Sequence, residues 1–172
     1  MKGQTYPWDD ETHFYPWDLR RREIVSKKTK VDYSWNEEIG LSICFITVRD
    51  QVYMGMAQCH PDDMDMVSEK TGNNIAYHRA VIDMLRAERD RLKIEAKALK
   101  EYYFALDHSP RFNRKSFEAK TLYRQIQMKD DDLANINDLI KATYHYIDQY
   151  INGKDEFYQK VRKQREARSE ES

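Results

Sequence analysis

The stretch "IAYHRAVIDMLRAERDRLKIEAKALKEYYFAL" (75–106) decides the fold, because its leucines recur every seven residues. The repeat consists of Leu85, Leu92, Leu99 and Leu106. Apolar residues at this spacing form a stripe along one face of a helix, and the stripe packs against a second helix. The spacing predicts a helix over about 74–106, capped by Asn73 or Asn74. The companion positions of the stripe are Ile75, Ile82, Ala96 and Tyr103.

The same spacing returns after the Ser-Pro break in "DHSPRFNRKS" (107–116). A second helix is predicted over about 116–165, and a short turn between two such helices makes them pack antiparallel. The end of the chain, "KVRKQREARSEES" (160–172), has almost no apolar content and is expected to fray. The second stripe consists of Ile126, Leu133, Ile140 and Ile147, with Leu122, Ile136, Tyr150 and Phe157 beside it.

A strand-like region precedes the helices. Apolar and polar residues alternate in "KVDYSW" (30–35), which is the period of a strand. Two further runs predict a small antiparallel meander over about 29–36, 40–49 and 52–59, and Gly55 marks a bulge or a close backbone approach. The predicted fold class is therefore α+β, a meander followed by a long two-helix hairpin. The predicted regions are an arm (1–22), the meander with an acidic loop (23–72) and the hairpin (73–172).

Composition narrows the classes of function. The chain of 172 residues has 29 basic and 30 acidic residues and a net charge of −1. This balance favours neither a DNA mimic nor a general nucleic-acid binder. No apolar run reaches the length of a membrane span and the N-terminus lacks a signal-peptide core, so we expect a cytoplasmic protein with reduced Cys44 and Cys59. The sequence indicates no cofactor.

The N-terminal arm repeats one motif, because Tyr-Pro-Trp-Asp occurs at 6–9 and again at 15–18. Proline favours an extended arm, and exposed tryptophans need cover. We expect Trp8 and Trp17 to be anchors, either on the chain's own sheet or on a neighbouring subunit or partner. The basic residues beside them, Arg20, Arg21 and Arg22, are candidates for contact with an anion.

Polar residues gather where the last strand meets the first helix: His60, Asp62, Asp63 and Asp65. Ligands on one short loop are poor evidence for a metal, so no metal site is predicted. Two interpretations remain, a solvated loop near a helix N-terminus, or a ligand-binding loop in which Arg79 meets an anion.

The tyrosines suggest a second kind of surface. The chain has 12 tyrosines, several of them in "TYHYIDQYI" (143–151). An exposed tyrosine stripe suits an interface, and the alternative is an ordinary tyrosine-rich core. We expect a homo-oligomer, a dimer or higher, with Tyr144, Tyr150 and Phe157 at its interface.

Residues 55–80 read G-x-A-x-C-x-P-x-D, an acidic spacer, and G-x-x-I-A-x-x-R-A. This pattern resembles a module of small proteins from phages infecting Gram-positive bacteria. The architecture is similar to that of the phage anti-Thoeris sponge proteins, and this resemblance implies oligomerisation and sequestration of a cyclic ADP-ribose signal. The matching residues are Gly55, Ala57, Cys59, Pro61, Asp63, Gly72, Ile75, Ala76, Arg79 and Ala80.

The leading hypothesis is a phage accessory protein, not an enzyme, that inhibits a host defence system by binding a nucleotide-derived signal or a host protein. The sequence has no nucleophile–base pattern, P-loop or metal set. One alternative is an assembly protein that uses the hairpin as a scaffold. Another is nucleic-acid binding through Arg20–Arg22, Lys27, Lys28 and Lys30.

Overall fold

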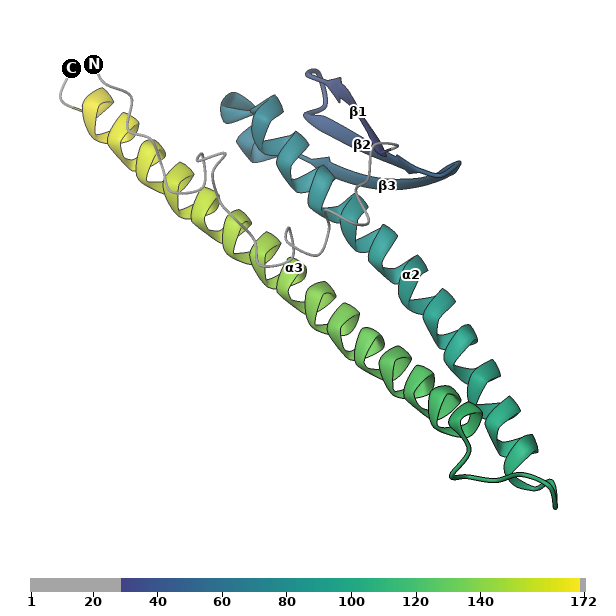
Figure 1. Ribbon diagram of the computed structural model, residues 1–172. Helices are drawn as coiled ribbons and strands as arrows, with labels where there is room; N and C mark the ends of the chain where they lie inside the picture. Colours follow the sequence, from purple (N-terminus) through teal and green to yellow (C-terminus); the bar gives the residue numbers. More distant parts are fainter. Residues whose placement is uncertain (1–28, 171–172) are drawn as a thin grey trace. The chain divides into compact units, whose positions relative to one another are not determined.

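The computed structural model describes residues 29–170. It is an α+β protein with a three-stranded antiparallel meander, a short 3-10 helix and two long helices that contact each other (Figure 1). The chain divides into two compact units, described separately. The sheet unit contains residues 29–81 and 144–170 of the described part, and the hairpin-tip unit contains residues 82–143.

The meander has the strand order β1-β2-β3. Its strands are β1 (Thr29–Asn36), β2 (Leu41–Val48) and β3 (Gln51–Gln58), within one residue of the predicted bounds. Arg49 and Asp50 form a two-residue turn with φ of 48° and 67°. Two positive φ values are the geometry of a type I′ turn, whose twist matches the strands that it joins.

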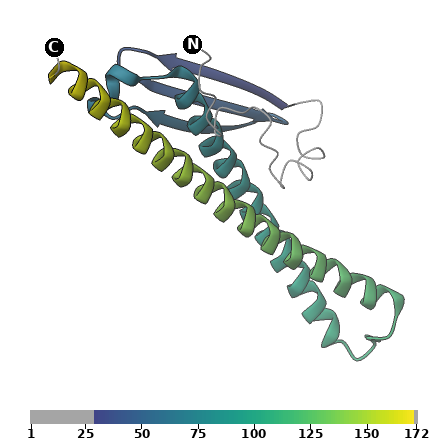
Figure 2. The same cartoon turned by 90° about the vertical axis from the view of Figure 1, so that its left-hand side faces the viewer.

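The inner face of the sheet packs closely on the first turns of helix α2 (Glu69–Asp107), as Figure 2 shows. A Cβ at Gly55 would lie 2.1 Å from the Ala76 carbonyl oxygen and 2.2 Å from the Ala80 nitrogen. The predicted close backbone approach at Gly55 is confirmed, and the pairing of β2 with β3 runs through it without a bulge. Gly55, Ala76 and Ala80 of the G-x-A…I-A-x-x-R-A pattern therefore have a packing role: their small size lets helix α2 lie directly on strand β3.

Helix α2 begins five residues before the predicted start, so the predicted caps Asn73 and Asn74 lie inside it. The prediction was wrong because it treated Gly72 as part of a loop. A Cβ at Gly72 would lie 2.7 Å from Ser42 Oγ, so a glycine is needed for the helix to pass over the sheet here. The Ser42 hydroxyl also donates a hydrogen bond to Asn73 Oδ1 at 2.6 Å.

The outer face of the sheet is more exposed. Val52, Met54 and Met56 on β3 are exposed, while Leu41, Ile43 and Phe45 on β2 are half-buried. Residues directly opposite in the register share a face, so these side chains form one apolar surface.

Helix α3 (Phe117–Glu170) also extends beyond its predicted end. The fraying of the charged end stays a prediction, and Arg162 and Arg165 of this segment form ion pairs with Asp63 and Asp65. No helix among residues 29–170 combines the length and the apolar character needed to cross a membrane.

In the hairpin-tip unit, residues 82–107 of α2 and 117–143 of α3 pack antiparallel along the predicted stripes. Leu85, Leu92, Ile126 and Ile140 are buried, which confirms the seven-residue spacing. Ion pairs cross between the helices: Glu95 Oε2 lies 2.5 Å from Lys129 Nζ, and Asp130 Oδ1 lies 2.7 Å from Lys100 Nζ.

Candidate functional site

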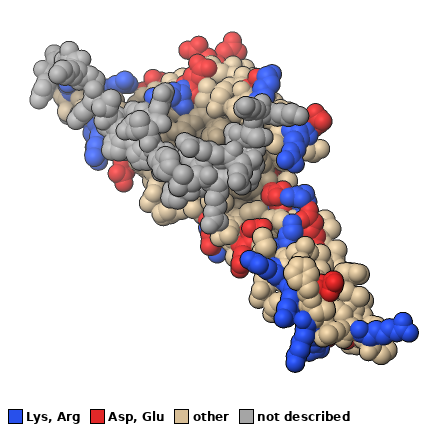
Figure 3. All heavy atoms as spheres, in the orientation of Figure 1, with Lys and Arg blue, Asp and Glu red and all other residues tan. Residues whose placement is uncertain are grey.

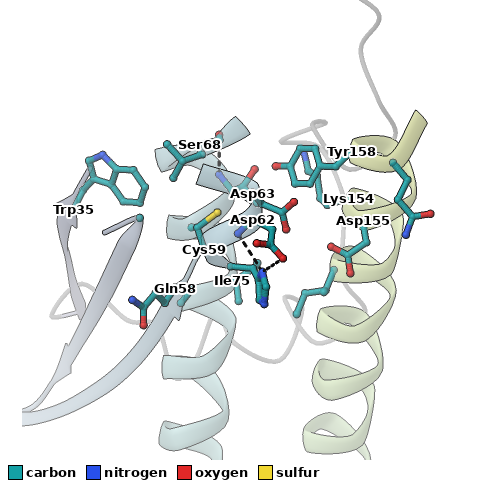
Figure 4. A pocket seen from close by; sticks show the side chains of 18 of the residues that line it. Trp35, Gln58, Cys59, Asp62, Asp63, Ser68, Ile75, Lys154, Asp155 and Tyr158 are labelled. Atoms are coloured by element: carbon teal, nitrogen blue, oxygen red, sulfur yellow. Dashed lines mark hydrogen bonds and ion pairs between the residues drawn. The ribbon is translucent and has the colours of Figure 1, made fainter. Parts of the chain in front are cut away.

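The sheet unit contains a pocket of about 450 Å³ between the sheet, the 3-10 helix η1 (Pro61–Met66), the start of α2 and the C-terminal part of α3. Small-molecule sites typically measure about 300–1,000 Å³. In Figure 4, Trp35 of β1 lies on one side, Lys154, Asp155 and Tyr158 of α3 lie on the other, and Asp62 lies between them. The pocket therefore joins segments that are far apart in the sequence.

Local sequence explains the floor of the pocket. Pro61 occupies the first turn of η1, and His60 caps this turn by accepting a hydrogen bond at Nδ1 from the Asp62 backbone N–H at 3.3 Å. Gly40 has φ of 58°, and its carbonyl oxygen accepts a hydrogen bond from the Cys59 N–H at 2.9 Å. A Cβ at Gly40 would lie 2.6 Å from the Cys59 Cβ, so only glycine fits in this wall.

The acidic residues of η1 are bound by arginines of α3. Arg162 forms an ion pair with Asp63 and donates a hydrogen bond to the Asp62 carbonyl oxygen at 2.6 Å. Arg165 Nη1 lies 3.0 Å from Asp65 Oδ2. These ion pairs reduce the repulsion that the acidic loop exerts on an anionic ligand, because two of its carboxylates already have cationic partners.

The pocket contains most of the predicted ligand-binding residues. His60, Asp62, Asp63 and Arg79 line it, whereas Asp65 does not. The Arg79 Nη1 donates a hydrogen bond to the Met56 carbonyl oxygen at 2.6 Å, which fixes the guanidinium beside β3. Their role in ligand binding stays a prediction.

Sequence analysis missed the contribution of α3. Lys154 Nζ lies 5.6 Å from the Tyr150 ring centroid, which is cation–π range. Burial raises the pKa of Tyr158, although a hydrogen bond with the Thr71 side chain acts in the opposite direction. A heptad pattern shows which residues pack, but it does not show which polar neighbours turn toward a distant loop.

Cys59 lines the pocket as a thiol. Burial raises its pKa, and the negative charges of Asp63 and Asp65 raise it further. Cys44 is fully buried, and burial raises its pKa to about 11. Both side chains are therefore protonated at neutral pH and are poor nucleophiles and metal ligands in that form. Within residues 29–170, no group of three or more His, Cys, Asp or Glu side chains is placed to hold a metal ion.

The charges that line the pocket are matched. Three cationic side chains face three carboxylates, and His60 adds a titratable group. Such a site does not attract an anion by net charge, so its selectivity must come from the positions of its polar groups and from the Trp35 ring. The cationic residues are Arg79, Lys154 and Arg162, and the carboxylates are Asp62, Asp63 and Asp155.

The predicted interface residues have different surroundings. Tyr150 is buried, so its ring belongs to the core of the sheet unit and has little surface for a partner. Tyr144 is exposed and Phe157 is half-buried, and their role at an interface stays a prediction. Trp8, Trp17 and Arg20–Arg22 lie outside the described residues.

We compared the chain with models of protein families, with curated proteins and with solved structures, and none of them matches.

Proposed function

We propose that the protein acts by binding, without catalysis, and that the pocket holds a small nucleotide-derived signal. The observation that carries the proposal is the placement of Arg79, Lys154 and Trp35 around one cavity of about 450 Å³. A phosphate group is matched by the two cations, a base by the indole ring, and ribose hydroxyls by the carboxylates of Asp62 and Asp155. The phage module described above gives this binding a biological setting, which is inhibition of a host defence system in the cytoplasm.

The matched charges also explain why a nucleotide suits the site better than a simple anion. Asp63 is paired with Arg162, and the lining also includes the cations Arg79 and Lys154 and the carboxylates Asp62 and Asp155. A ligand that offers only phosphate is attracted by the cations but repelled by these carboxylates. A ligand that offers phosphate and hydroxyl groups satisfies both kinds of side chain.

Isothermal titration calorimetry with cyclic ADP-ribose isomers and cyclic oligonucleotides tests the proposal. We expect Arg79→Ala and Lys154→Ala to weaken binding by roughly tenfold or more, because each removes a charge-assisted hydrogen bond. Lys163→Ala is the matched control, because Lys163 is exposed on α3 and does not line the pocket. No heat from the wild-type protein with either ligand class would exclude this proposal.

Self-association is a second proposed property. The apolar outer face of the sheet favours it, since Val52, Met54 and Met56 are exposed there and large apolar patches mark interfaces. Sedimentation of the full chain at micromolar concentration is expected to give a dimeric or larger mass. A monomeric mass would exclude it, and a variant lacking residues 1–19 would show whether the aromatic arm is required.

A further inference from the structure

The hairpin-tip unit carries a basic, aromatic surface that the proposed ligand pocket does not use. Residues 97–124 contain seven Lys or Arg and three Asp or Glu, in a chain whose net charge is −1. Figure 3 shows Lys and Arg side chains gathered at this end of the hairpin. The near-neutral total therefore hides a local excess of positive charge.

A shallow groove of about 430 Å³ lies within this surface. Tyr103 and Tyr123 form its aromatic part, with ring centroids 6.0 Å apart and an angle of 52° between the rings. The Tyr103 ring is held in place by an edge contact with Phe112, whose centroid lies 5.8 Å away. The lining also contains the cations Arg114, Lys120 and Arg124, with Ala119 and Gln127, and it includes no carboxylate.

The groove cations differ in how they are held. Arg114 is bound by Asp107, with two nitrogen–oxygen distances of 2.5 Å, and so it stiffens the turn between the helices. The side chains of Lys120 and Arg124 form no ion pair with any residue in the described part of the chain, and neither do those of Arg111 and Lys115 nearby. Four cations without carboxylate partners are therefore available to an anionic partner.

We propose that this groove binds single-stranded nucleic acid, with bases stacked on Tyr103 and Tyr123 and backbone phosphates on Lys120 and Arg124. Aromatic side chains beside a positively charged groove are the arrangement that holds a single strand, because every unpaired base offers a face for stacking. Tyr102, Phe104 and Phe117 are also exposed at this end of the hairpin, with Tyr102 and Phe104 on different sides of α2. In a duplex the bases are already stacked on one another, so this surface favours single strands.

A membrane fits the surface less well. The turn over 108–116 is mainly polar and basic, and its Phe112 is half-buried and contacts the Tyr103 ring edge-on. The exposed Phe104 and Phe117 lie on the helices on either side of this turn, so the vesicle measurement below is included to test insertion into a bilayer. The concave, tyrosine-lined shape of the groove is better matched by a base than by a lipid chain.

Fluorescence anisotropy with a labelled single-stranded oligonucleotide of about 12 nucleotides tests the proposal. We expect Tyr123→Ala to weaken binding by about tenfold, and Tyr123→Phe to restore it, because phenylalanine keeps the stacking face. The double variant Lys120→Ala/Arg124→Ala is expected to weaken binding and to reduce the dependence of affinity on salt. The control is Lys160→Ala/Lys163→Ala, which removes two exposed cations of α3 outside the tip.

The design distinguishes the outcomes. Equal weakening by the control pair, equal affinity for the matching duplex, or no anisotropy change at micromolar protein would overturn the proposal. Stronger binding to vesicles of mixed phosphatidylserine and phosphatidylcholine than to the oligonucleotide would also overturn it, in favour of a membrane. Circular dichroism melts of each variant show whether the hairpin is intact. If Tyr123→Ala unfolds, a loss of binding by Tyr123→Phe, or unchanged binding by the double cation variant, would still overturn the proposal.

Discussion

The pocket of the sheet unit and the groove of the hairpin-tip unit both contain basic and aromatic side chains, but only the pocket also contains carboxylates that balance its positive charge. In the pocket, Arg162 is bound to Asp63, and the lining holds as many carboxylates as Lys and Arg side chains. In the groove, Lys120 and Arg124 have no carboxylate in the lining. Matched charges favour recognition by position, whereas unmatched charges attract polyanions and respond to salt. The same residue types thus support two different kinds of binding.

The largest effect on the hairpin-tip unit, which carries the groove, is expected from removing apolar packing between its two helices. Leu92 is buried in the stripe of α2, and Leu92→Ala is expected to lower the free energy of unfolding by about 2–5 kcal/mol. Ile94, on the same helix, is 73% exposed, so Ile94→Ala is a control with a small effect. Urea unfolding measures both, and equal stability of the two variants would contradict the heptad seam.

The second prediction concerns the packing of β3 on α2 in the sheet unit, which contains the pocket. Gly55→Ala places a methyl group where only 2.1 Å separates the Cβ position from the Ala76 carbonyl oxygen. We expect a loss of about 1–3 kcal/mol in the free energy of unfolding, because helix and strand must separate.

Gly55→Ala should also weaken ligand binding at the pocket, since Ala57 and Arg79 line it from the same strand and helix. Groove binding is expected to change little. Val52→Ala, at an exposed site on β3, is the control. A Gly55→Ala variant as stable as the wild type would contradict the close packing.

The reactivity of Cys59 can distinguish the two sites, because Cys59 lines the pocket and not the groove. Burial raises the pKa of its thiol, so alkylation by iodoacetamide is expected to be slow at pH 7 and to accelerate as the pH rises. A ligand in the pocket is expected to protect Cys59, and an oligonucleotide in the groove is not. Mass spectrometry of the modified chain measures the rate, and equal protection by both ligands would mean that the two sites are not separate.

The smallest expected effect is on how the free energy of unfolding of the hairpin-tip unit depends on acid pH. The pKa of Glu95 is lowered by its hydrogen bond with Lys129 and by the charge of Arg91. The stabilisation is therefore present above the ordinary carboxyl pKa near 4 and is lost as the pH falls through the lower pKa of the folded state. For this partly exposed pair we expect no more than about 1 kcal/mol. Glu95→Gln is expected to remove that part of the acid dependence of urea unfolding, and an unchanged dependence would contradict it.

The fold was largely predictable from the sequence, because its main signals are periodic. The leucine spacing located the seam, and the alternation around Val31, Tyr33 and Trp35 located β1. The start of α2 was not predictable by the same means. Gly72 disfavours a helix locally, and the compensating fit against Ser42 exists only in the folded sheet unit.

The candidate site was predictable only in part. His60, Asp62, Asp63 and Arg79 are close in sequence, and their spacing was informative. Arg162 is 99 residues from Asp63, and nothing periodic connects the two. The basic end of the hairpin could have been found from the local excess of positive charge over 97–124, but the net charge of the whole chain does not show it.

The pairing of Arg162 with Asp63 has a consequence for the order in which the two regions mature during synthesis. At elongation rates of about 5–20 residues per second, the 99 residues between them take on the order of 10 seconds to translate. The groove, by contrast, is built from residues within 103–127, which leave the ribosome together. The nascent chain therefore completes its groove first, and the pocket is closed only when the arginines of α3 arrive.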